Sequence, residues 1–349
     1  MFEQSLSRTY RRYRSLQTHR ISILPIAILM PHSACNCRCI MCDIWKGNRN
    51  LKQLTENDIS SLLRSFKALD TQQVVMSGGE ALLNPLFFRF CELLKEKGIR
   101  ISLLSTGLAL QQHADKLVQL VDDIIVSLDG DAALHNHIRN IPNAFEKMRE
   151  GIDAVLSASP GYRISARSVI HKLNFRHWPA IVETALSMQL QQISFLPADT
   201  TSEAFNRAEP WSTERQCEIL PSEEELTELS DITETLISHY SDLFASGFIA
   251  ESPEKIRKIP LYYSAMYGHN PFPYKKCNAP WVSAVIEADG TVRPCFFHAP
   301  VGNIREQDLD TIVNGAKAFR FRKELDMDNN DTCRRCVCYL NLKPGAAIH

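Results

Sequence analysis

Four cysteines lie within eight residues near the start of the chain, at Cys35, Cys37, Cys39 and Cys42. Thiolates are ligands for soft metals and iron–sulfur clusters. Cys35, Cys39 and Cys42 have the spacing C-x3-C-x2-C, and three thiolates on so short a loop can bind three irons of a cubane. The fourth iron would stay open to another ligand, whereas ferredoxin-type clusters normally use four cysteines. The other interpretations are a zinc site completed by Cys37 and a set of free thiols; zinc sites usually use two separated cysteine pairs.

A second group of cysteines occupies the last quarter of the chain and consists of Cys277, Cys295, Cys333, Cys336 and Cys338. Four thiolates from separate segments can enclose a cubane completely, and such a cluster could carry electrons but could not bind a substrate. A zinc ribbon is the alternative for this region taken alone. Nothing else in the sequence marks a secreted protein, so the 11 cysteines indicate metal thiolates in a reducing cytoplasm.

The elements that must position these cysteines alternate along the first 198 residues. Apolar runs typical of buried strands occur at 23–30, 73–77, 100–105, 123–128, 163–170 and 192–196. Amphipathic helices are expected between them, one opened by a capping box at Thr55–Asp58, one starting at Asn84-Pro85 and ending at Gly98, and others at 113–120, 144–157 and 178–188.

Six strand–helix units in series predict an α/β fold with a parallel sheet, because parallel neighbours need crossover connections. A complete eight-unit barrel needs about 250 residues. The pattern here covers only residues 23–198, so we expect an open, partial (β/α)6 TIM-like barrel. The first cysteine group directly follows the first strand, at the rim where parallel barrels carry their active sites.

Three further segments lie at predicted strand ends and could bind a ligand. Ser77-Gly-Gly-Glu80 follows the second strand; its glycines allow close approach of the backbone, and Glu80 can accept a hydrogen bond from an ammonium group. Ser105-Thr-Gly107 follows the third strand. Ser127-Leu-Asp-Gly130 follows the fourth and is succeeded by His135 and Arg139. An arginine can bind a carboxylate with two hydrogen bonds; the alternative for Arg139 is a surface ion pair.

Together these motifs resemble the radical S-adenosylmethionine (SAM) superfamily. The resemblance implies that Cys35, Cys39 and Cys42 hold a [4Fe-4S] cluster whose open iron binds SAM. It implies SAM contacts from Gly78, Gly79, Glu80, Ser105, Ser127 and Arg139. The family usually has an aromatic residue before the last cysteine, where this chain has Met41, a polarizable substitute.

The C-terminal cysteines resemble the SPASM/twitch extension of the same superfamily. In both forms the opening pattern is C…G-x4-C, which Cys277, Gly290 and Cys295 match. Five cysteines are too few for the two clusters of the longer form, so the resemblance implies one auxiliary [4Fe-4S] cluster. Its expected ligands are Cys277, Cys295, Cys333 and Cys336, with Cys338 as the alternative to Cys336. A predicted hairpin at 282–294 makes this module α+β.

Four regions follow from these expectations: a basic, solvated arm at 1–22, the barrel at 23–198, a bridging segment at 199–276 and the auxiliary domain at 277–349. Aromatic residues of the bridging segment could face the substrate or pack in the core; they are Trp211, Tyr262, Tyr263 and Tyr267. A net charge of −1 argues against nucleic-acid binding. The apolar run at 21–30 is too short for a membrane span of about 20 residues.

The resemblance implies a radical SAM oxidoreductase that forms a 5′-deoxyadenosyl radical and removes a hydrogen atom from its substrate. The cysteine spacing is similar to that of an aminocyclitol dehydrogenase, which favours a sugar-like small molecule and an auxiliary cluster that accepts an electron. Peptide or protein maturation is the first alternative, with only some 20 residues before the first strand against it. A non-catalytic iron–sulfur or zinc protein is the second. The expected partners are the substrate and a reductant such as flavodoxin or ferredoxin.

Overall fold

The computed structural model describes residues 5–204, 206–207 and 209–348. Its centre is a nine-stranded sheet in the order β6-β5-β4-β3-β2-β1-β7-β8-β9. The first six strands are parallel and follow one another along the chain. They are β1 (Ile26–Leu29), β2 (Gln73–Met76), β3 (Arg100–Ser105), β4 (Asp123–Ser127), β5 (Ile164–Ile170) and β6 (Gln192–Pro197). The predicted open, partial barrel of six units is confirmed.

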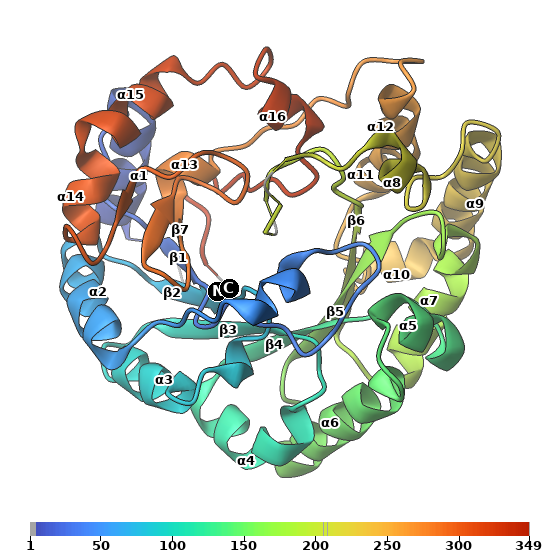
Figure 1. Ribbon diagram of the computed structural model, residues 1–349, viewed down its shortest axis with the longest axis horizontal. Coiled ribbons are helices and arrows are strands. Elements are labelled where there is room, and N and C mark those ends of the chain that lie inside the picture. Colours follow the sequence, from blue (N-terminus) through green and yellow to red (C-terminus); the bar gives the residue numbers. More distant parts are fainter. Residues whose placement is uncertain (1–4, 205, 208, 349) are drawn as a thin grey trace.

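Helices cover the outer face of this sheet and form an arc around the strands (Figure 1). They are α2 (Glu56–Ala68), α3 (Phe87–Lys95), α4 (Leu110–Leu120), α5 (Ala132–Arg139), α6 (Ala144–Ala158) and α7 (Trp178–Ser187). The predicted capping box of α2 is present, with the Thr55 hydroxyl and the Asp58 carboxylate each bonded to the other's backbone N–H. Helix α3 begins at Phe87, and Asn84 instead donates its side-chain amide to the carbonyls of Pro31 and Leu54.

The bridging segment adds short helices beside β6: α8 (Thr213–Cys217), α9 (Leu226–His239), α10 (Ser241–Ala245), α11 (Pro253–Ile256) and α12 (Lys258–Met266). Between α10 and α11 the backbone pairs with β6 through a bridge from Ile249 to Ile193. The Tyr263 hydroxyl donates to Ile170 O and accepts from Ala198 N at 2.8 Å. Tyr263 is therefore a buried link between the ends of β5 and β6, not a cavity residue.

The C-terminal module continues the barrel sheet. After α13 (Ala279–Val282), strand β7 (Ser283–Ile286) pairs in parallel with β1, and β8 (Thr291–Arg293) completes the predicted hairpin. A short β9 (Gly302–Asn303) and helices α14 (Leu309–Asn314), α15 (Ala316–Glu324) and α16 (Asp331–Arg335) follow. The hairpin was predicted, whereas its pairing with the first strand of the barrel was not.

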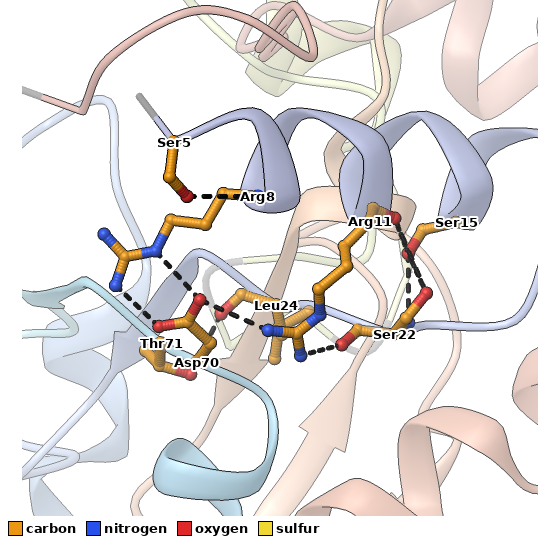
Figure 2. A network of polar contacts seen from close by, with 8 residues as sticks. All are labelled: Ser5, Arg8, Arg11, Ser15, Ser22, Leu24, Asp70 and Thr71. Atoms are coloured by element: carbon orange, nitrogen blue, oxygen red, sulfur yellow. Dashed lines mark hydrogen bonds and ion pairs between the residues drawn. The ribbon is translucent and has the colours of Figure 1, made fainter. Parts of the chain in front are cut away.

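The expectation of a solvated N-terminal arm is wrong for the described residues. Helix α1 (Leu6–Thr18) packs on the body of the protein, and its Arg12 is only 1% exposed. The Asp70 carboxylate accepts hydrogen bonds from Arg8 Nε at 2.9 Å, Arg8 Nη2 at 2.8 Å and Arg11 Nη1 at 3.3 Å. Figure 2 shows this network. The arginines find a carboxylate and backbone carbonyls on distant segments, so this end of the chain is bound to the barrel.

No helix in the described ranges has the length and apolar character that crossing a bilayer requires.

Candidate functional site

The first cysteine group lies on the loop after β1, and backbone hydrogen bonds fix this loop on two sides. Arg38 N and Ile40 N donate to the carbonyls of Arg139 and Ile138 at the end of α5. On the other side Glu80 N donates to Ala34 O at 2.9 Å. A Cβ on Gly79 would lie 2.1 Å from Ala34 O, so only glycine lets the segment after β2 approach the loop this closely.

Each of the three predicted ligand sulfurs accepts an N–H hydrogen bond. Cys35 Sγ accepts from Cys37 N, Cys42 Sγ from Ile44 N, and Cys39 Sγ from Arg139 Nη1, all at 3.5 Å. Such bonds stabilise thiolates and are a means by which proteins tune iron–sulfur clusters. All 11 cysteines are free, so no disulfide competes for these sulfurs.

The electrostatics differ among the cysteines of this loop. Burial raises the pKa of Cys35 and of Cys42 to about 12. The pKa of Cys39 is lowered, mainly by a hydrogen bond from the Cys37 thiol and also because Arg139 is close. Cys37 is 1% exposed and acts here as the hydrogen-bond partner of Cys39. The three spaced cysteines can therefore hold a cluster, and Cys37 supports one of them.

Glu80 is fully buried and its carboxylate is largely occupied by the protein. Its Oε2 accepts from Ser105 Oγ at 3.0 Å and Thr106 N at 2.8 Å, and its Oε1 accepts from Leu82 N at 3.2 Å. Burial raises the Glu80 pKa, and these donors oppose that effect. Glu80 and Ser105 thus join the ends of β2 and β3; a SAM contact by either stays a prediction. Thr106, which also contacts Asn36 of the cysteine loop, was missed by sequence reasoning.

Arg139 is buried rather than part of a surface ion pair. Its Nη2 lies 2.5 Å from Asp129 Oδ2, and its Nε has no hydrogen-bond partner among the described residues. Burial alone would lower the Arg139 pKa, but Asp129 and Cys39 raise it, so the guanidinium stays charged. Arg139 can face a ligand carboxylate only through the part of its guanidinium that Asp129 leaves open. Ser127 ends β4 half-buried on the same rim.

A tryptophan of the bridging segment packs on the cysteine loop. Trp211 forms a small apolar cluster with Ala198 and Ile219, against which Met41 packs. Its indole Nε1 donates to Asp43 Oδ2 at 2.6 Å, directly after Cys42. The guanidinium carbons of Arg207 and Arg215 lie 5.0 and 4.7 Å from its ring centroid. Met41 therefore packs beside an aromatic residue of the bridging segment, and Asp43 and Trp211 are loop-positioning residues that the motifs did not reveal.

A cavity of about 430 Å³, the mouth cavity, opens between the barrel rim and the C-terminal module. From the barrel it is lined by Gly78, Gly79 and the cysteine-loop residue Ser33. From the C-terminal module it is lined by Arg293 and Phe296, which flank Cys295, and by the hairpin residues Glu287 and Asp289. Two ion pairs lie in its wall, Lys52 with Asp289 and Arg293 with Glu287, both at 2.8 Å.

The C-terminal cysteines meet around a second cavity of about 470 Å³, the auxiliary cavity. Cys277, Cys295, Cys333 and Cys336 all line it, and so does Cys338, so both candidates for the fourth ligand are present. His298 Nε2 lies 3.3 Å from Cys333 Sγ. Lys275 Nζ donates to the carbonyls of Arg334 and Cys336, and burial lowers its pKa to about 8. His298 and Lys275 were not foreseen.

Within the described ranges no three Cys, His, Asp or Glu side chains surround the position of a single metal ion. A cubane cluster requires a different arrangement of ligands from a single metal ion. Each thiolate binds a different iron, so the cysteine sulfurs lie farther apart. Five cysteines around one cavity, and three on a loop whose sulfurs all accept N–H bonds, are donor sets that suit iron–sulfur clusters.

Two family models match the chain. Residues 29–185 match the Radical SAM superfamily, and residues 277–337 match an iron–sulfur cluster-binding domain known as SPASM. The AdoMet-dependent heme synthase of Methanosarcina barkeri (strain Fusaro / DSM 804) is 24% identical, covering 82% of this chain and 81% of the relative. A cysteine-type anaerobic sulfatase-maturating enzyme of Clostridium novyi (strain NT) is 22% identical, covering 92% and 87%.

Among solved structures, the Streptococcus suis protein SuiB bound to its precursor peptide SuiA has a TM-score of 0.63 at 14% identity, covering 93% of this chain and 73% of that one. At this identity the likeness concerns the fold alone. It extends over the barrel and the C-terminal module together.

Proposed function

Since the chain belongs to the radical SAM superfamily and carries a SPASM-type iron–sulfur domain, we propose that it removes a hydrogen atom from a small polar molecule and oxidises it. Its cofactors are SAM and [4Fe-4S] clusters. The chemistry that they supply is reductive cleavage of SAM by one electron from a flavodoxin or ferredoxin, giving methionine and a 5′-deoxyadenosyl radical, which takes one hydrogen atom from a substrate C–H bond. The auxiliary cluster would supply an acceptor for the electron that the substrate radical gives up when it is oxidised, with one proton released to solvent.

Separate sets of residues in this chain hold the clusters and position SAM. Cys35, Cys39 and Cys42 hold the cluster that binds SAM, and Cys277, Cys295, Cys333 and Cys336 hold the auxiliary cluster. Gly78 and Gly79 keep the SAM side of the mouth cavity open at the cysteine loop. Glu80 and Ser105 hold that rim in shape through their hydrogen bond. Ser127 and Arg139 face SAM from the ends of β4 and α5.

The observation that carries the proposal is the position of the mouth cavity. Its walls come both from the SGG turn beside the SAM cysteines and from the residues that flank Cys295. A substrate held there would contact both the segment beside the SAM cysteines and the segment that carries Cys295. Its charged, ion-paired lining suits a polar molecule such as a sugar or aminocyclitol, while the heme-synthase relative broadens the range of small substrates to be tested.

Peptide or protein maturation is the second candidate. It is supported by the sulfatase-maturating relative, whose length this chain nearly spans, and by the fold shared with SuiB. A short precursor-peptide gene beside this gene would favour it, whereas neighbouring sugar-modifying genes would favour the small-molecule reaction.

Anaerobic reconstitution tests the proposal. Protein reconstituted with iron and sulfide should contain about eight irons per chain and, with dithionite and SAM, form 5′-deoxyadenosine. Host extract is then separated into small-molecule and peptide fractions, and the small-molecule fraction should raise the rate of 5′-deoxyadenosine formation. Stimulation by the peptide fraction alone would favour maturation. Absence of 5′-deoxyadenosine under all conditions would favour a non-catalytic iron–sulfur protein.

A further inference from the structure

A third, smaller cavity of about 100 Å³ lies where the edge of the barrel meets the C-terminal cysteines; we name it the seam pocket. Its charged lining residues are Arg167 of β5, Glu251, Lys255, Lys258 of α12 and Lys275. Four cations thus face one carboxylate. Cys336 and Cys338 line this pocket and also the auxiliary cavity, so the two spaces share a wall.

Two of the four cations are balanced by known neighbours. Lys255 lies 3.3 Å from Glu251. Lys275 Nζ donates to the carbonyls of Arg334 and Cys336, beside the cysteines that are predicted to hold the auxiliary cluster. Arg167 and Lys258 remain. Arg167 Nε donates to Ser194 Oγ at 3.2 Å and Lys258 Nζ to Tyr274 O at 2.8 Å, but no carboxylate of the described chain forms an ion pair with either.

A buried hydroxyl in the same wall points to a ligand. Tyr262 is 1% exposed, and its hydroxyl has no hydrogen-bond partner within the described ranges. Buried polar atoms are nearly always hydrogen-bonded, so an unpartnered hydroxyl on a residue that lines the pocket indicates a missing acceptor. Two unbalanced cations and one free O–H donor are the groups that bind a small oxyanion.

The pocket also faces the reaction side of the sheet. Arg167 is paired in register with Ser127, so the two side chains leave the sheet on the same face. Val169, two residues after Arg167, packs against the apolar cluster around Trp211, and so does Met41 of the cysteine loop. An anion in the seam pocket therefore lies on the face that carries the SAM-binding loop and beside the auxiliary cysteines.

Building on the proposed function, we propose that the seam pocket binds a carboxylate or phosphate group of the substrate, through Arg167, Lys258 and the Tyr262 hydroxyl. The anionic group anchors the substrate at one end, on the face of the sheet that carries Ser127 and the cysteine loop. The substrate is thus an acid or a phosphate ester rather than a neutral sugar.

Anion binding to reconstituted holoprotein tests this directly. Inorganic phosphate and acetate are titrated separately by calorimetry, at an ionic strength held constant with chloride. We expect one of them to bind with one site per chain, phosphate indicating a phosphate ester and acetate a carboxylic acid. Arg167→Gln and Lys258→Gln should each weaken that binding by about tenfold or more, and Tyr262→Phe by about tenfold.

Lys276→Gln is the matched control, because Lys276 is exposed, adjoins Lys275 and does not line the pocket. It should leave the dissociation constant unchanged. Iron content is measured for every variant, so that loss of a cluster is recognised. If neither anion binds above the chloride background, or if the Arg167→Gln, Lys258→Gln double variant binds as tightly as wild type, the anion site is refuted. Uncoupled 5′-deoxyadenosine formation is measured in the same samples, and its absence in wild type would refute the proposed function instead.

Discussion

Cys35, Cys39 and Cys42 come from one loop of eight residues, whereas Cys277, Cys295, Cys333 and Cys336 come from separate places over sixty residues. The first group is positioned by backbone contacts with α5 and with the turn after β2. The second is positioned by a hairpin, a short helix and two loops that meet around the auxiliary cavity. The geometry of a local motif is set by the few neighbours that hydrogen-bond to its loop. The geometry of a dispersed site is set by the fold of its whole module.

Substituting one cysteine in each group should reveal the largest difference between the two groups, which is their effect on SAM cleavage. Cys39→Ala should abolish SAM cleavage, because it removes a ligand of the only cluster expected to have an open iron. Cys333→Ala should spare cleavage at least in part. Each variant should retain about four irons. The measurements are iron content and 5′-deoxyadenosine after dithionite reduction; the opposite pattern of activity would reverse the assignment of the two groups.

Gly79→Ala should displace the loop that carries the first cysteine group, although Gly79 is not itself a predicted cluster ligand. The added Cβ would meet backbone at Ala34 O, which cannot rotate away, so we expect a loss of about 3 kcal/mol of stability and a displaced loop. Thermal unfolding and iron content measure both effects. Gly98→Ala is the control: its Cβ meets open space, and only its positive φ of 68° adds strain, of about 1 kcal/mol. Equal effects of the two variants would contradict the close-approach explanation.

Trp211→Phe changes a contact between the bridging segment and the first cysteine group and should leave the second group unaffected. It keeps a ring near the guanidinium groups of Arg207 and Arg215 but loses the hydrogen bond to Asp43, which costs about 2 kcal/mol for a charged acceptor. The electron paramagnetic resonance signal of the SAM-binding cluster should change, while that of the auxiliary cluster stays constant. Unchanged spectra of both clusters would show that Trp211 does not position the loop.

His298→Phe should act only on the second group. A hydrogen bond to Cys333 stabilises the reduced cluster, so its loss should lower the auxiliary midpoint potential by about 40 mV, the equivalent of about 1 kcal/mol for one electron. Redox titration measures this shift. His269→Phe replaces a half-exposed histidine that does not line the auxiliary cavity, so it should leave the potential unchanged.

Asp58→Asn should have the smallest effect, at the joint between barrel and module. Burial would raise the Asp58 pKa, but Arg305 and the backbone and hydroxyl of Thr55 lower it overall. A lowered folded-state pKa contributes stability that is present above the unfolded value of about 3.9 and is lost as the pH falls through the lower folded value. The variant should be less stable by about 1 kcal/mol at neutral pH. Its deficit in the unfolding midpoint should be constant from pH 6 to 8; a deficit that grows toward acid pH would contradict this ion pair.

The six barrel strands could be predicted because each is a short segment rich in apolar residues that lies between helical patterns. The α2 cap was predictable because its partners, Thr55 and Asp58, are three residues apart. The pairing of β7 with β1 was not predictable, since a hairpin suits a free module equally well and its register depends on an edge formed some 250 residues earlier. The same limit explains α1, whose arginines bind Asp70 on another segment.

The candidate site shows the same division. The positions of the cysteines and of Gly79 followed from local spacing. The partners of Glu80 lie on the next strand, so its hydrogen bonds to Ser105 and Thr106 could not be deduced from the Ser-Gly-Gly-Glu sequence. Trp211 and His298 belong to segments without a motif, and only the folded chain brings them to Asp43 and Cys333.

Strand β7 pairs with the edge of β1 that β2 leaves free. The C-terminal module therefore cannot be deleted without exposing an edge of the barrel sheet. A chain truncated before residue 277 would leave the inner strand of the sheet with a row of unpaired amides and carbonyls. Such an edge is a template for intermolecular strand pairing. The truncated protein should therefore self-associate into aggregates rather than survive as a smaller enzyme, which makes the last quarter of the chain a condition for solubility as well as a carrier of cysteines.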